Sequence, residues 1–136
     1  MRSVTITGIG LSATLLAGCL GVTPSVEAGR QLYAENGCAS CHGPSGHGDG
    51  PSAATLPARP IDFRNVSQFK RGTSEAAIAQ TLAEGVSIVH TLPQFHITHH
   101  QLLMPKFDHL TETERRSIAL YVISMRNAAA QGGVQP

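Results

Sequence analysis

The chain has 136 residues, enough for one domain, and its ten Lys and Arg nearly balance its nine Asp and Glu. It carries no basic stripe of the kind that nucleic-acid-binding proteins need, which excludes that class. Apolar residues make up 41% of the chain, but only four Phe, two Tyr and no Trp can fill a core. Such a thin core favours a small domain that a large flat cofactor completes.

The chain begins with the pattern of an export signal. Arg2 gives a short positive start, and residues 4–16 form a mostly apolar run. That run is too short and too rich in Ser and Thr for a membrane span, which needs about 20 apolar residues. We therefore expect the mature protein to be exported, facing the periplasm or the cell exterior.

Cys19 indicates how the exported chain is attached. It closes the string Leu16-Ala17-Gly18-Cys19, which resembles the bacterial lipobox, whose cysteine is acylated and becomes the new N-terminus. This pattern predicts a lipoprotein signal peptide at 1–18 and a lipid anchor and tether at 19–25, holding the protein to a membrane. The alternative is an ordinary signal peptide that is cleaved after Ala28.

A first helix is expected over residues 26–36, where Leu32 and Tyr33 are the main apolar side chains and Asn36-Gly37 ends the helix. Gly29 lies inside it and costs about 1 kcal/mol relative to Ala. A close crossing with another helix would justify that cost.

The next segment holds the remaining pair of cysteines, in the string Cys38-Ala39-Ser40-Cys41-His42. This is the signature of c-type haem attachment. Each thiol adds to one vinyl group of the porphyrin, and the adjacent imidazole of His42 becomes the proximal iron ligand. A structural zinc site needs a second pair of ligands, a thioredoxin-like site needs a βαβ pattern, and a bare disulfide needs no histidine.

Residues 43–72 are dense in Gly and Pro and are expected to form loops that wrap the cofactor. A second helix is predicted at Glu75–Glu84, capped by Thr73 or Ser74 and stopped by Gly85.

The sixth iron ligand is sought among methionines and histidines. Met104 lies in a Pro-stiffened segment before the final helix, where a loop can hold a thioether over iron. Met125 is expected to be a core residue. The alternatives to Met104 are an open position or a nearby histidine, from the group His90, His96, His99, His100 and His109.

The final helix is expected to begin with a capping box of Thr111 and Glu114. Its apolar stripe has helical spacing and consists of Ile118, Val122 and Met125. The predicted domain spans 26–128, and residues 129–136 are expected to form a flexible tail.

Together these strings resemble the class I cytochromes c of bacteria. The likeness rests on Gly29-Arg30-Gln31-Leu32-Tyr33 before the haem motif, on Gly48-Asp49-Gly50-Pro51 with Pro60-Ile61-Asp62-Phe63, and on Met104-Pro105 with Phe107, Leu110-Thr111 and Tyr121. It implies an all-α fold in which the first and last helices cross, with one or two short helices and loops around one haem. It also implies that Tyr121 packs at Gly29 and that the Pro51 carbonyl accepts a hydrogen bond from His42.

The expected function is one-electron transfer between membrane or periplasmic redox partners, without catalysis, as a monomer or as a subunit of a respiratory complex. The cofactor is one haem c, bound through Cys38 and Cys41 with His42 and Met104 on the iron. One alternative is a haem enzyme or gas-binding protein with an open sixth site. Another is a tethered haem subunit of a larger dehydrogenase or oxidase complex.

Overall fold

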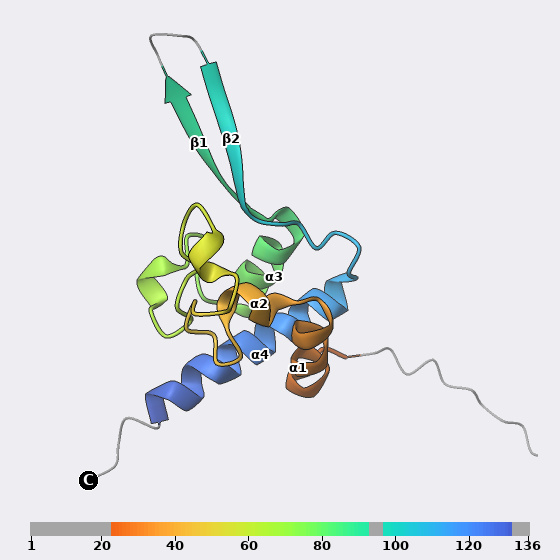
Figure 1. Ribbon diagram of the computed structural model, residues 1–136. Coiled ribbons are helices and arrows are strands. Elements are labelled where there is room, and N and C mark those ends of the chain that lie inside the picture. Colours follow the sequence, from red (N-terminus) through yellow and green to blue (C-terminus); the bar gives the residue numbers. More distant parts are fainter. Residues whose placement is uncertain (1–22, 93–96, 132–136) are drawn as a thin grey trace, which may run out of the picture.

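The computed structural model describes residues 23–92 and 97–131. Within them lie four α-helices, two short 3₁₀ helices and one antiparallel pair of β-strands, joined by loops (Figure 1). In chain order they are α1 (Val26–Glu35), α2 (Cys38–His42), η1 (Ala53–Thr55), η2 (Val66–Gln68), α3 (Glu75–Glu84), β1 (Val86–Leu92), β2 (Ile97–Met104) and α4 (Glu112–Gln131). The predicted signal peptide at 1–18 and the lipid site at Cys19 lie outside the described residues.

The helix boundaries follow the local capping signals. The hydroxyl of Ser25 accepts from the backbone N–H of Ala28 at the start of α1, and Ser74 does the same for Ala77 in α3, both at 3.2 Å. α3 then ends at Gly85, whose φ of 69° is the left-handed conformation that glycine adopts readily. The first and second predicted helices are thereby confirmed, with Ser74 as the cap of α3.

The capping box of α4 is also present. Glu114 N–H donates to the Thr111 hydroxyl at 3.3 Å, and the Glu114 carboxylate accepts from Thr111 N–H at 2.7 Å. α4 continues to Gln131, beyond residue 128 where the domain was predicted to end. The alanines at 128–130 explain this extension, because alanine is the strongest helix former.

α1 and α4 cross at Gly29, the residue that the sequence marked as costly. A Cβ built on Gly29 would overlap the backbone carbonyl of Ser117 in α4 and lie 2.9 Å from the Cβ of Tyr121. Beside the crossing, the rings of Tyr33 and Tyr121 meet edge to face with centroids 5.4 Å apart. The absence of a side chain at Gly29 therefore permits the close approach of the two helices (Figure 1).

The core lies between α1, α3, α4 and the loop at residue 63. Its buried side chains are Tyr33, Phe63, Ile78, Ala79, Leu82, Leu110, Ile118, Ala119 and Val122. Two of the three residues of the predicted α4 stripe belong to it, and Met125 packs against it half-buried. The predicted all-α fold is confirmed for this body of the molecule.

The exception is the hairpin of β1 and β2, which stands out from the helical body (Figure 1). Met104 was predicted in a loop, but it is the last residue of β2 and is the partner of Val86 across the antiparallel pair. β1 is rich in β-branched residues, which favour extended backbone, whereas β2 has two of them, Ile97 and Thr98. The register shifts between Val86 and Ser87, because Ser87 is opposite Leu102 and Leu103 is an extra residue.

Candidate haem-binding site

The three motif residues Cys38, Cys41 and His42 all lie on the single short helix α2. Left-handed glycines bound it on both sides, Gly37 with a φ of 66° and Gly43 with a φ of 78°. Both thiols are partly buried and free. The helix therefore presents two sulfurs and one imidazole from one turn of chain.

The loop at residues 50–52 is hydrogen-bonded to backbone carbonyls of α2. Gly50 N–H donates to the Cys41 carbonyl at 3.1 Å, and Ser52 N–H donates to the Ser40 carbonyl at 2.8 Å. A Cβ on Gly50 would overlap the Ser40 backbone, so only glycine allows this approach. Pro51, a predicted site residue, lies between these two bonds, next to the haem motif.

The imidazole of His42 is the main polar group of the site. Its Nδ1 is buried and has no hydrogen-bond partner, and its ring stacks on Phe63 with centroids 4.8 Å apart. Burial lowers the pKa of His42, and the backbone of Ile61 opposes that shift only in part. The ring is thus held neutral, the form that binds metal. The bond that the resemblance implied from His42 to Pro51 is not made at Nδ1, so that role stays a prediction.

These donors fit a covalently attached haem better than a bare metal ion. Burial raises the pKa of the Cys38 thiol to about 11, and zinc and similar ions bind thiolates rather than thiols. A buried nitrogen without a partner costs about 1–3 kcal/mol, which a bound group at His42 would relieve. Two free thiols and a buried imidazole whose Nδ1 has no partner lie on a single turn, and these are the groups that haem attachment uses.

Two aromatic residues support the motif and were not assigned to the site from the sequence. The Tyr33 hydroxyl donates to the Gly43 carbonyl at 2.8 Å in a buried contact, which ties α1 to the end of α2. Phe63 is held against His42 by its N–H, which donates to the Gly46 carbonyl at 2.8 Å. Tyr33 and Phe63 each lie at least ten residues from the group that they contact. In the sequence, only the resemblance of the strings that contain them indicated a role.

Met104 lies where the hairpin rejoins the helical body. Its side chain is half-buried and packs against the core cluster that Cys38 also contacts. Three residues later, Phe107 N–H donates to the Leu82 carbonyl at 2.8 Å, which fixes the segment to the end of α3. The structure thus brings Met104 and Cys38 to the same cluster of apolar side chains.

The histidine alternatives for the iron that the structure describes lie on the hairpin strands and just before α4. His109 is exposed, and its Nε2 is bonded to Asn36 Oδ1 at 3.0 Å. His90, His99 and His100 belong to the hairpin strands, and His96 lies outside the described residues.

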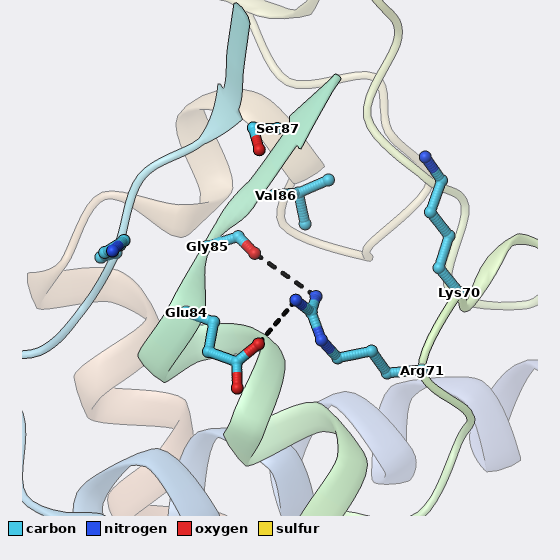
Figure 2. A pocket seen from close by; sticks show the side chains of 7 residues that line it. Lys70, Arg71, Glu84, Gly85, Val86 and Ser87 are labelled. Atoms are coloured by element: carbon cyan, nitrogen blue, oxygen red, sulfur yellow. Dashed lines mark hydrogen bonds and ion pairs between the residues drawn. The ribbon is translucent and has the colours of Figure 1, made fainter. Parts of the chain in front are cut away.

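A cavity of about 520 Å³ lies at the base of the hairpin (Figure 2). Arg71 spans it, with Nη2 2.7 Å from the Glu84 carboxylate and Nη1 donating to the Gly85 carbonyl at 3.4 Å. Lys70 and Lys106 complete its charged lining, and none of the three motif residues takes part. This cavity is therefore not the haem site; its ion pair secures the junction between α3 and β1.

Comparison with known proteins agrees with this site. The family model described as cytochrome c matches residues 26–126. The chain belongs to the cytochrome c family. Among solved structures it is similar to a chain of the Kuenenia stuttgartiensis reducing HAO-like protein complex Kustc0457/Kustc0458, with 30% identity and a TM-score of 0.59. That match covers 79% of this chain and 47% of the other, so this cytochrome c domain spans about half the length of its neighbour.

A comparison with curated proteins found no match. Membership of the family implies covalently bound haem c, which agrees with the spacing of Cys38 and Cys41. Within residues 23–92 and 97–131, no helix combines the length and apolarity that crossing a membrane requires.

Proposed function

We propose that this cytochrome c is a monohaem carrier of single electrons between membrane or periplasmic redox partners. The observation that carries the proposal is the buried, unpartnered Nδ1 of His42 on the same helix as two free thiols. Haem bound there supplies the one-electron chemistry of iron, and the protein supplies attachment, orientation and dielectric.

The roles of the residues follow from their positions. Cys38 and Cys41 hold the haem covalently, and His42 is the proximal ligand. Phe63 stacks on the His42 ring and so limits its rotation. Met104 is the distal ligand, and a thioether raises the reduction potential relative to a second histidine. With His42 and Met104 both bound, the iron would have no open site for substrate, which would suit electron transfer.

The test is a visible spectrum of the oxidised and reduced protein beside Met104→Ala and Met125→Ala. Both methionines pack half-buried on the same core, so the second variant is a matched control. Ligation by Met104 predicts a weak far-red sulfur-to-iron band that Met104→Ala abolishes and Met125→Ala retains. A haem protein without that band, or with a band that survives Met104→Ala, rejects the assignment. Rapid carbon monoxide binding by the ferrous wild type would instead favour the open-site alternative.

A second candidate is a haem subunit tethered within a larger redox complex. The observation that favours it is the similar solved chain, which is a component of a multi-protein complex and of which the match covers 47%. Purification from native membranes in mild detergent separates the two forms. A free carrier elutes alone, whereas a subunit co-elutes with a larger redox protein in fixed ratio.

We also propose that Cys19 carries lipid and that the domain faces the periplasm or cell exterior. The proposal is supported by the lipobox-like string that ends at Cys19. Mass spectrometry of the mature N-terminus tests it: an acylated Cys19 supports the anchor, whereas an unmodified chain beginning at Gly29 supports cleavage after Ala28.

A further inference from the structure

The segment that joins Met104 to α4 is held on one side by the end of α3. Phe107 N–H donates to the Leu82 carbonyl at 2.8 Å. A Cβ built on Gly85, the residue that ends α3, would lie 2.7 Å from the Met104 carbonyl oxygen. The backbone of the segment therefore passes in close contact with α3.

Arg115 holds the same segment from α4. Its Nη1 donates to the Phe107 carbonyl at 3.4 Å and also to the Leu110 carbonyl. Leu110 N–H in turn donates to the Phe107 carbonyl at 3.3 Å, so Arg115 and a backbone bond close the same turn, residues 107–110. Phe107 is thus bonded through its N–H to α3 and through its carbonyl to Arg115.

The charge of Arg115 is unusual for its position in α4. It is the fourth residue of the helix, near the end where the helix dipole disfavours a cation. Among the described residues Arg115 makes no ion pair, whereas Arg116 beside it pairs with Glu75 at 2.6 Å. Its half-buried side chain is instead committed to two backbone carbonyls. Hydrogen bonds from a charged donor are about twice as strong as neutral ones, so this arrangement holds the turn firmly.

We propose that Arg115 is a positioning residue for Met104 and keeps the thioether within reach of the iron. This inference rests on the proposed ligation of the iron by Met104. Only two residues separate Met104 from Phe107, and one of them is Pro105, whose ring fixes its φ. The hold of Arg115 on Phe107 is therefore transmitted to Met104 through a short, stiff stretch of chain. When that hold is removed, the sulfur leaves the iron more readily and a competing ligand enters.

The test is titration of the haem-loaded ferric protein with imidazole, which competes with Met104 for the sixth position. Loss of a hydrogen bond to a charged group changes an equilibrium constant by about 10-fold or more. Arg115→Gln should therefore bind imidazole at least about 10-fold more tightly than the wild type. Arg115→Lys keeps the charge but lacks the planar fork that reaches two carbonyls, and it should recover only part of the difference. Arg116→Gln is the matched control, because it removes the neighbouring arginine and its ion pair with Glu75, and it should bind imidazole as the wild type does.

Met104→Ala separates failure of this inference from failure of the ligand assignment. If Met104 binds the iron, Met104→Ala takes up imidazole more tightly than the wild type, and adding Arg115→Gln to it has no further effect. Unchanged binding in Met104→Ala rejects the ligand and the inference together. Tighter binding in Met104→Ala but not in Arg115→Gln, or an equal change in Arg115→Gln and Arg116→Gln, overturns the role of Arg115 and leaves Met104 as the ligand. A lower Tm of Arg115→Gln without tighter imidazole binding also overturns it, because Arg115 would then only stabilise the turn.

Discussion

The crossing of α1 and α4 at Gly29 predicts that Gly29→Ala lowers the free energy of unfolding, although helix propensity alone would raise it. Replacing Gly29 with Ala adds a methyl group that would overlap the Ser117 carbonyl and press on the Cβ of Tyr121. Neither is the flexible end of a long side chain, so the two helices must separate. Helix propensity acts in the opposite direction, since alanine is favoured over glycine by about 1 kcal/mol.

The balance of these terms sets the expected size of the effect. Overpacking a well-packed interior costs about 1–3 kcal/mol, and contact with a rigid backbone puts Gly29→Ala at or above the upper end. After the gain in propensity, we expect a net loss of about 2 kcal/mol. For a domain of roughly 100 residues this lowers Tm by about 8–16 °C.

Thermal unfolding of the haem-loaded protein, followed by far-ultraviolet circular dichroism, measures the shift. Ala34→Gly is the matched control, because Ala34 is an exposed residue of the same helix. It should lower stability by about 1 kcal/mol through propensity alone. A Gly29→Ala protein whose Tm equals or exceeds that of the wild type would show that the crossing does not require glycine.

Two further predictions concern the hydroxyl of Tyr33 and the carboxyl of Asp62. Tyr33→Phe removes the shorter of two bonds to the Gly43 carbonyl, which keeps only the one from Gly46 N–H at 3.3 Å. Urea denaturation should therefore show a loss of about 0.5–1.5 kcal/mol, whereas Tyr121→Phe should change stability by less than about 0.5 kcal/mol. An equal effect of both variants would contradict the role of the Tyr33 bond. Arg64, whose Nε is 2.9 Å from Asp62 Oδ1, lowers the pKa of Asp62 from 3.8 to about 2. Because unfolded Asp62 takes up its proton first, its contribution to stability is present above pH 3.8 and is lost as pH falls towards 2. NMR titration should move its midpoint back up in Arg64→Ala, and an unchanged midpoint would exclude Arg64 as the cause.

The parts of the fold that the sequence predicted are those with local causes. A cap such as Ser74 bonds to a backbone group three residues away, so the signal and its partner lie in one short string. The same holds for Thr111 and Glu114. The motif of Cys38, Cys41 and His42 is also local, because one helical turn carries the whole set.

The missed features depend on residues that are distant along the chain. The stacking of Phe63 on His42 joins positions 21 residues apart, and no spacing rule in the sequence announces it. The segment of Met104 was predicted as a loop stiffened by Pro105, whereas Met104 is the last residue of β2. The extended conformation of Met104 follows from its pairing with Val86, and that pairing exists only once both strands have formed.

The same pairing at the base of the hairpin bears on how this protein can diverge. Since Val86 and Met104 are partners, the chain leaves the helical body and re-enters it at one point. Residues can be gained or lost beyond that point without moving either end. Such a projection can therefore change in length and composition while Met104 keeps its place, so the hairpin surface can evolve independently of the proposed iron ligands.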